Sequence, residues 1–198
     1  MSSTTLVFFD LETGGLDHGL HAITQIAAVA VAADSLAEVD RFEVKVKFRP
    51  ENVDPAAMSL NSYNAETWER EAVHPLDACT RLSTFFQKHA TFRMTSHRTG
   101  RDYFVAQLAG HNAATFDGPF LQAWYKRLDQ FLPASYRVLC TLQRAVWHFQ
   151  ERPDVCQPES FKLGVLCEHF GIPATDAHDA LADVLATVEL YRALRGTT

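Results

Sequence analysis

The first third of the chain places apolar runs between polar breaks in the manner of β-strands. Residues 6–9 form an unbroken apolar run, which is typical of a central strand covered on both faces. A second apolar run covers residues 23–33 and ends at the turn-like pair Asp34-Ser35. From Phe42 to Phe48, apolar and charged residues alternate, which predicts a half-exposed, antiparallel strand. This part of the chain is therefore predicted to form three strands.

Helical spacing of apolar residues dominates the rest of the chain, with short apolar runs between the helices. We first predict a helix opened by Pro75, a strand over residues 105–109 and a helix from Pro119 whose apolar stripe reaches Phe131. A strand over residues 137–140 and a helix through Trp147 follow. The last two predicted helices are one N-capped by Ser160 and ended by Gly171 and Pro173, and one from about Asp179 to Leu194. Strands that come first and then alternate with helices predict an α/β domain with a mixed sheet. The 198 residues contain no repeat or linker, so one domain is expected over residues 1–198.

The composition narrows the class of protein. Apolar residues make up 47% of the chain, which is above the range of disordered proteins. No apolar run reaches the roughly 20 residues of a membrane-spanning helix, and the polar residues 1–5 do not resemble a signal peptide. The four cysteines are irregularly spaced and form no Cys-x-x-Cys pair, which favours reduced thiols. A cytoplasmic protein without membrane contact is expected.

The charge limits how the protein could hold nucleic acid. The chain has 18 basic and 24 acidic residues, a net charge of −6. This balance argues against a protein that binds nucleic acid through a broadly basic surface of Lys and Arg residues. A contact to phosphate through bound cations stays open, because cations held by carboxylates reverse the local charge.

Two carboxylates follow the first apolar run. Asp10 and Glu12 lie two residues apart on a predicted strand, so both side chains leave the same face of the sheet. Carboxylates this close repel each other unless a cation joins them. Solvated acids at an exposed strand end are the alternative reading. The run before them is predicted to be buried, and Thr13-Gly14-Gly15 after them lets a ligand approach the backbone closely, so taken alone the pair supports a metal site and an exposed strand end equally.

Two further acids lie in predicted helices. Asp117 precedes Gly118-Pro119 at the start of one, where the unpaired N–H groups suit a carboxylate, and taken alone it is best read as an ordinary N-cap. Asp183 lies within a helix that is apolar around most of its circumference, where burying an unpaired carboxylate is costly. A metal ion or an Arg partner would remove that cost. His178 comes five residues before Asp183 and reaches the same site if it lies in or just before the first turn.

Together these residues form the motifs Asp-x-Glu-Thr-Gly-Gly, His-Asn-x-x-x-Phe-Asp-x-x-Phe-Leu and His-x-Ala-x-x-Asp, in this order. In this the sequence resembles the DEDDh family of 3′–5′ exonucleases, the DnaQ-like group with an RNase H-like fold. The resemblance covers about residues 5–195. The spacing from His111 to Asp117 looks more like the TREX and exonuclease I subgroups, and Gln25 stands where many relatives have Glu. Both differences argue against a replicase proofreading subunit.

The resemblance implies a metal-dependent 3′–5′ exonuclease that releases nucleoside 5′-monophosphates, with two Mg²⁺ or Mn²⁺ ions as cofactors. It assigns the metal ligands to Asp10, Glu12, Asp117 and Asp183, the general base to His178, and the contacts to the terminal nucleotide to Thr13, Gly14, Gly15, Leu16 and Asn112, with His111 as support. The expected substrates are nucleic acid 3′ ends, single-stranded or frayed, with DNA favoured over RNA. The oligomeric state, the pathway and any polymerase or repair partner cannot be read from the sequence.

Four alternatives stay open at this point. The basic residues of segment 91–104, among them Arg98 and Arg101, favour a solvated loop or hairpin over an arm that guides the strand. An exoribonuclease or oligoribonuclease of the same fold would use the same site. A non-catalytic binding module would be free to lose carboxylates, and none is missing here. His178-Asp179 alone also resembles the dyad of HD-domain phosphohydrolases, an all-α family that the predicted strands contradict.

Overall fold

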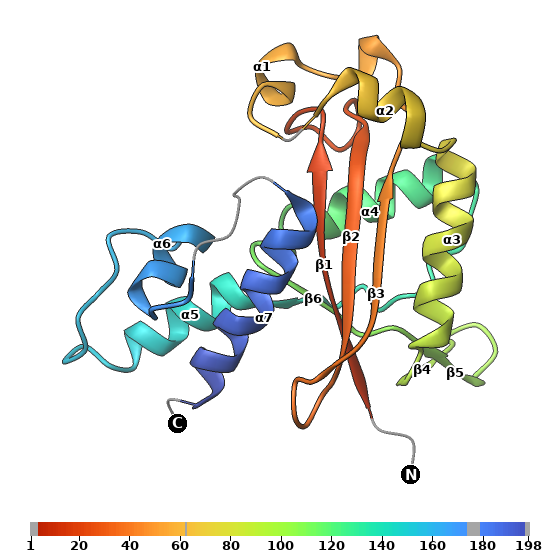
Figure 1. The fold of residues 1–198 in the computed structure, drawn as a ribbon. Helices are drawn as coiled ribbons and strands as arrows, with labels where there is room; N and C mark the ends of the chain where they lie inside the picture. The colour runs from red at the N-terminus through yellow and green to blue at the C-terminus, as the bar shows by residue number, and fades with distance from the viewer. Residues whose placement is uncertain (1–3, 62, 174–178, 197–198) are drawn as a thin grey trace.

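The computed structural model describes residues 4–61, 63–173 and 179–196 as a mixed sheet with helices on both faces (Figure 1). The elements are, in chain order, β1 (Thr5–Thr13), β2 (Ile23–Ala32), β3 (Glu38–Lys45), the 3₁₀ helix η1 (Pro50–Asn52), α1 (Pro55–Met58), α2 (Ala65–Glu71), α3 (Pro75–Lys88), β4 (Phe92–Thr95), β5 (Asp102–Val105), β6 (Leu108–Gly110), α4 (Asp117–Arg127), β7 (Leu139–Cys140), α5 (Thr141–Gln150), α6 (Leu163–His169) and α7 (Ala180–Gly196). The predicted α/β class is confirmed.

The main sheet has the strand order β3-β2-β1-β6-β7. Strands β1, β2 and β3 pair antiparallel, whereas β6 and β7 continue the sheet in parallel from β1. This combination is an RNase H-like arrangement. It also excludes the all-α alternative, because the central strand β1 is paired on both sides.

The period of two in β1 divides the core into two layers. Val7, Phe9 and Leu11 point to the layer under α3 and α4, where they pack with buried aromatic residues of both helices. Leu6 and Phe8 point the other way and pack against the apolar face of α7. Figure 1 shows α7 crossing the sheet on this side, with α3 and α4 on the other. Every second residue of β1 is therefore presented to α7.

The predicted run over residues 105–109 is divided between two sheets. Val105 pairs with Phe92 in the β4–β5 hairpin, whereas Leu108 pairs with Val7 of β1. Between them, Ala106 turns to bridge Ala134. The expected single strand is wrong because the apolar run serves two pairings, and apolar character alone does not indicate the break.

Two helix boundaries also differ from the prediction. Helix α4 ends at Arg127, because Asp129 adopts a left-handed backbone (φ 52°) and the Gln130 N–H donates to Tyr125 O, which closes the helix. Phe131 thus leaves the stripe and is 71% exposed. Ser160 is not the N-cap of α6. The first helical hydrogen bond accepts at Lys162 O, and Lys162 caps the helix with its backbone alone.

The short elements η1, α1 and α2 were not predicted, because three to seven residues are too few to show helical periodicity. They lie above the carboxyl end of β1 in Figure 1. Among the described helices, none has the length and apolar character needed to cross a membrane.

Candidate active site

The carboxyl end of β1 presents two acids to α7. Asp10 and Glu12 follow Leu6 and Phe8 in the alternation, so their side chains lie on the α7 face of the sheet. The predicted placement on a common face is confirmed. The strand continues to Thr13, so both acids are held by the antiparallel ladder with β2, opposite Ala27 and Gln25.

Helix α7 brings the third acid to this pair. Val184 and Val188 of α7 are buried against the sheet, which orients the helix so that Asp183 faces β1. Ligand oxygens of Asp10, Glu12 and Asp183 lie within 4.8 Å of one another, and all three residues are half-buried. A set of carboxylate oxygens at this spacing could hold a divalent cation such as Mg²⁺ or Mn²⁺.

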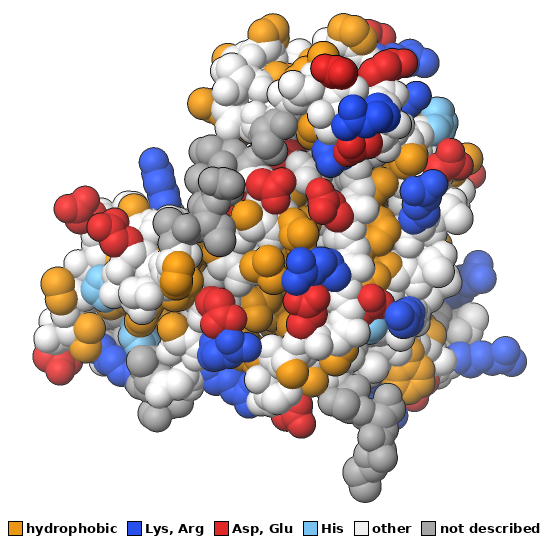
Figure 2. Space-filling model, in the orientation of Figure 1, with side chains coloured by type: hydrophobic (Ala, Val, Ile, Leu, Met, Phe, Trp, Pro, Cys, Tyr) orange, Lys and Arg blue, Asp and Glu red, His pale blue; other side chains and the backbone are white. Residues whose placement is uncertain are grey.

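The electrostatics of this cluster favour a bound cation. Burial, followed by the charges of Asp117, Glu12 and Asp183, raises the pKa of Asp10 well above its ordinary value. Burial and the neighbouring charge of Asp183 raise the pKa of Glu12 from 4.5 to about 8. Figure 2, which views the α7 face, shows acidic side chains beside the grey atoms near the upper end of the sheet. A cation would remove the repulsion that these shifts record, so the residues fit a metal.

Asp117 lies beside this cluster but is held differently. It is the first residue of α4, 4% exposed, and its Oδ1 accepts a hydrogen bond from the Leu11 N–H at 3.2 Å. The carboxylate thus takes the place of a strand partner where β1 extends beyond β6. Burial raises the pKa of Asp117 to about 7. Asp117 is not one of the three mutually close acids, although its charge acts on Asp10.

Asp179 is a further acid of the site that the sequence reading did not assign. Its Oδ1 accepts from the Ala182 N–H at 3.1 Å, which makes it the N-cap of α7. Its charge contributes to the raised pKa values of Asp10 and Glu12. The sequence does contain a signal for this capping role. Asp179 stands at the start of a predicted helix, three residues before Ala182, and an N-cap side chain accepts from an N–H at that spacing.

Gln25 connects this N-cap to the sheet. Its side chain is 1% exposed, and Nε2 donates to Glu43 Oε1 at 3.0 Å and to Asp179 Oδ2 at 3.5 Å. Its Oε1 is buried and accepts no hydrogen bond within the part of the chain that the structure describes. The neutral amide therefore lies among carboxylates, where a Glu would add one more negative charge.

The loop after β1 packs closely against neighbouring segments. A Cβ atom at Gly14 would lie 2.4 Å from Val53 Cγ1, and one at Gly15 would lie 2.6 Å from the His21 ring. Thr13 Oγ1 donates to Gly15 O at 2.8 Å. The two glycines are thus required by protein neighbours, which adds a structural reason to the predicted contact with substrate. Leu16 is 85% exposed and available to a ligand.

His111 and Asn112 follow β6 and tie the site to the later helices. The ring nitrogens of His111 lie 3.0 Å from Thr141 Oγ1 and from Phe161 O, and burial lowers the pKa of this imidazole. Asn112 is exposed in a left-handed conformation (φ 55°), with its Oδ1 accepting from Thr115 Oγ1 at 2.7 Å. His178, predicted as the general base, lies outside the described residues.

The basic segment 91–104 forms the β4–β5 hairpin, stabilised by Thr95 Oγ1 donating to Asp102 Oδ1 at 2.7 Å. Figure 1 places this hairpin at the opposite end of the sheet from the carboxyl end of β1. Of the two forms expected for this segment, a loop or a hairpin, the structure has the hairpin. Its position argues against a role in guiding a strand into the site.

The fold and the carboxylate cluster define a nuclease of the RNase H-like class. The model of the exonuclease family matches residues 7–93 and 101–191. The chain therefore belongs to the exonuclease family, and with its motifs to the DEDDh 3′–5′ exonucleases. The gap in the match, residues 94–100, covers the end of β4 and most of the turn of the β4–β5 hairpin.

Similar proteins are found among curated sequences and solved structures. The chain is 28% identical over 187 residues to the PolC-type DNA polymerase III of Oceanobacillus iheyensis, covering 92% of this chain and 11% of the polymerase, and 27% identical over 191 residues to that of Bacillus subtilis, covering 96% and 11%. Escherichia coli exonuclease I in complex with a dT13 oligonucleotide matches with a TM-score of 0.75 and 20% identity, covering 97% of this chain and 41% of that one. The chain thus spans about a tenth of the curated relatives.

Proposed function

We propose that this chain is a metal-dependent 3′–5′ exonuclease that releases nucleoside 5′-monophosphates from 3′ ends of DNA, single-stranded or frayed. The observation that carries this proposal is the cluster of Asp10, Glu12 and Asp183 at the carboxyl end of β1. Residues 1–198 are taken as a single exonuclease domain. DNA is favoured over RNA because the PolC-type relatives are DNA polymerases and the similar exonuclease I binds dT13.

Asp10, Glu12 and Asp183 would hold the cations, with Asp117 contributing from the start of α4. Two bound Mg²⁺ or Mn²⁺ ions would neutralise charge on the scissile phosphate and on the leaving 3′ oxygen. The chain itself supplies the framework: β1 fixes two acids by its ladder, and the Leu11 N–H fixes Asp117. These contacts fix the positions of the carboxylates before a ligand binds, so the site is preorganised.

The remaining proposed residues would bind the nucleotide and move a proton. Thr13, Gly14 and Gly15 present a closely packed loop to the 3′ end, and the exposed Leu16 packs on the terminal base. Asn112 is exposed beside the start of α4 and would contact the same nucleotide. His178 would accept the proton of the attacking water at one ring nitrogen.

Replacing His178 with Ala should lower turnover by roughly 100-fold to 10,000-fold, because a positioned general base contributes about that factor. The rise of the rate with pH between about 5.5 and 7.5 should disappear as well, since that limb would report the imidazole, whose ordinary pKa is about 6.5. Steady-state rates over this pH range measure both effects. An unchanged pH profile at a normal rate would remove His178 from the mechanism.

The substrate assignment is tested by initial rates on DNA and RNA strands of matched length and sequence, with mononucleotides separated by chromatography. Faster release of deoxynucleoside 5′-monophosphates supports DNA. Faster release from RNA would favour an exoribonuclease of the same fold. Tight binding of both strands without any mononucleotide would favour a non-catalytic binding module.

Removing both Arg98 and Arg101 should leave binding of single-stranded DNA and its salt dependence unchanged. Both residues are exposed on the β4–β5 turn, at the far end of the sheet from the carboxylates. Each phosphate contact of a single strand contributes about 0.7 to the slope of log affinity against log salt. A titration at several salt concentrations would detect a lost contact, and a slope smaller by about 1.4 would show that the hairpin guides the strand after all.

A further inference from the structure

The α7 face of β2 carries one polar side chain. In the alternation of this strand, Ala27, Val29 and Val31 point to α7 and pack in the apolar layer beneath it. Gln25 stands two residues before Ala27 and directly opposite Glu12 of β1, so its side chain lies on the same face, next to the carboxylate cluster. It is 1% exposed. A buried amide in a strand face that is otherwise apolar needs hydrogen-bond partners.

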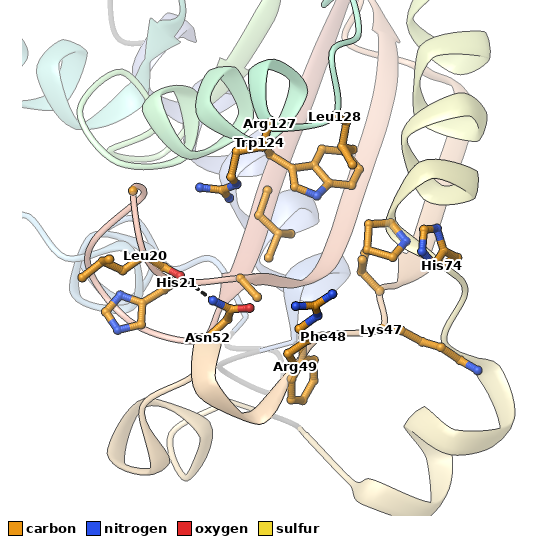
Figure 3. A pocket seen from close by; sticks show the side chains of 15 residues that line it. Leu20, His21, Lys47, Phe48, Arg49, Asn52, His74, Trp124, Arg127 and Leu128 are labelled. Carbon is orange, nitrogen blue, oxygen red and sulfur yellow. Dashed lines mark hydrogen bonds between the residues drawn. The ribbon is translucent and has the colours of Figure 1, made fainter.

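The other face of the sheet has a different character at this end. Figure 3 shows a cavity of about 670 Å³ there, and Ile23, Val46 and Trp124, each at most 5% exposed, are among the residues that line it. The described residues around this cavity include no Asp or Glu. The contacts of Gln25 to carboxylates therefore lie on the α7 face.

The Gln25 amide joins two carboxylates from different elements. Its Nε2 donates to Glu43 Oε1 of β3 at 3.0 Å and to Asp179 Oδ2, just before α7, at 3.5 Å. Glu43 Oε1 also lies 3.8 Å from Lys45 Nζ, which holds Glu43 at the edge of the sheet. Because both partners are acceptors, they fix the orientation of the amide, and Oε1 is left buried with no donor in the described part of the chain.

Asp179 connects Gln25 to the first turn of α7. Its Oδ2 accepts from Gln25, its Oδ1 accepts from the Ala182 N–H at 3.1 Å, and its backbone O accepts from the Asp183 N–H at 3.0 Å. Asp183 is the acid that α7 brings within 4.8 Å of the two acids of β1. One side chain thus binds the sheet and caps the helical turn that carries Asp183, so a shift of Asp179 would move Asp183 within the cluster.

We propose that Gln25 is a positioning residue, which acts through Asp179 to hold Asp183 in its place in the carboxylate cluster. The unpaired Oε1 supports this role. A buried acceptor without a donor lowers the stability of the fold, and an apolar side chain of the same shape would avoid that cost. The inference rests on the proposed function only in that Asp183 serves as a metal ligand. Contacts behind the ligands determine how precisely a metal site is held.

The first test is made without metal. Gln25→Met keeps an unbranched side chain of similar length but removes both the donor and the acceptor. In EDTA, amide hydrogen exchange followed by NMR should become roughly five-fold faster at Ala182 and Asp183, because weakening an N-cap costs about that factor. Exchange at Val188, in the middle of α7, should not change. Gln25→Leu, measured in parallel, should show the same pattern.

The second test measures the cluster itself. Binding of Mn²⁺ to the Gln25→Met protein, followed by the electron paramagnetic resonance signal of the free ion, should be weaker by roughly ten-fold. At a Mg²⁺ concentration near the wild-type dissociation constant, kcat on a dT12 oligonucleotide should fall while KM stays unchanged, because a buried side chain does not touch the strand. A residue needed only for packing would lower the melting temperature without this split.

Gln107→Met is the matched control. Gln107 is also a buried glutamine, 6% exposed, and its Nε2 donates to Leu108 O at 3.1 Å and to Arg137 O at 2.6 Å. Its substitution should lower the melting temperature, because two carbonyl groups lose a donor. It should change neither the exchange at the start of α7 nor the affinity for Mn²⁺.

An Asp179→Ala protein shows whether Gln25 acts through Asp179. In that background, Gln25→Met should change neither the exchange rates nor the Mn²⁺ affinity any further. Additive effects, equal exchange in the wild-type and Gln25→Met proteins, or faster exchange with unchanged Mn²⁺ affinity would overturn the proposal. A wild-type protein that binds no Mn²⁺ and releases no nucleotide would contradict the proposed function, whereas the exchange rates in EDTA still decide the role of Gln25.

Discussion

The Asp10→Asn protein should lose hydrolysis by at least about 1,000-fold while becoming more stable without metal. Besides burial, the charges of four neighbouring acids, Asp117, Glu12, Asp183 and Asp179, act on the Asp10 carboxylate. The amide keeps the shape of the side chain but removes a negative charge, which relieves that repulsion and weakens cation binding. Nuclease rates in Mg²⁺ measure the loss of hydrolysis. Melting curves of the same preparation in EDTA measure the gain in stability.

The opposite signs of these effects make the prediction specific. If Asp10 were needed only for folding, its substitution would lower the activity and the stability of the protein together. The matched control is Asp154→Asn, which changes the same charge at an exposed position far from β1 in sequence and should change neither rate nor melting. Normal hydrolysis by Asp10→Asn would contradict the assigned site.

The second large effect concerns pH and metal. Folding raises the pKa of Glu12 to about 8 and that of Asp117 to about 7. The metal-free folded protein therefore keeps protons that the unfolded chain releases above its ordinary pKa values near 4. The stabilisation from this protonation is present below about pH 4 and is lost as the pH rises toward 8.

Each unit of pKa difference corresponds to roughly 1.4 kcal/mol, so this contribution falls by on the order of a few kcal/mol between pH 5 and pH 8. Burial lowers the pKa of His111 and His148, which acts in the opposite direction below about pH 6.5. The comparison is therefore made between the wild-type protein and Glu12→Gln, in which the loss of stability with rising pH should be smaller.

Bound metal should reverse the loss of stability with rising pH. At pH 8 in excess Mn²⁺, the wild-type protein should gain about 2.7 kcal/mol at 100 times the dissociation constant, and Glu12→Gln much less. Melting curves at pH 5 and pH 8, with EDTA or Mn²⁺, measure all four states. If the stability of the two proteins in EDTA depended equally on pH, folding would not raise the pKa of Glu12, and the account of the carboxylate cluster would be contradicted.

The elements that could be predicted from the sequence are those with a repeating pattern. The period of two placed Asp10 and Glu12 on one face, and the structure confirms it because β1 is a regular strand between two partners. The apolar circumference of α7 indicated that Asp183 would need compensation, and the helix does carry it to the other two acids.

The parts that could not be predicted depend on contacts between distant segments. Gln25 was recognised only as a departure from relatives, whereas its hydrogen bonds to Glu43 and Asp179 join β2, β3 and α7. The end of α4 was misplaced because Asp129, not a glycine, adopts the left-handed conformation that closes the helix.

The most direct test of the central claim is a time course with 5′-labelled single-stranded DNA in Mg²⁺, in EDTA, and with the Asp10→Asn protein. An exonuclease that works from the 3′ end should give a ladder that shortens from the full length, and the ladder should be absent in both controls. Intact DNA after incubation with folded wild-type protein and Mg²⁺, or fragments from internal cuts at early times, would contradict it.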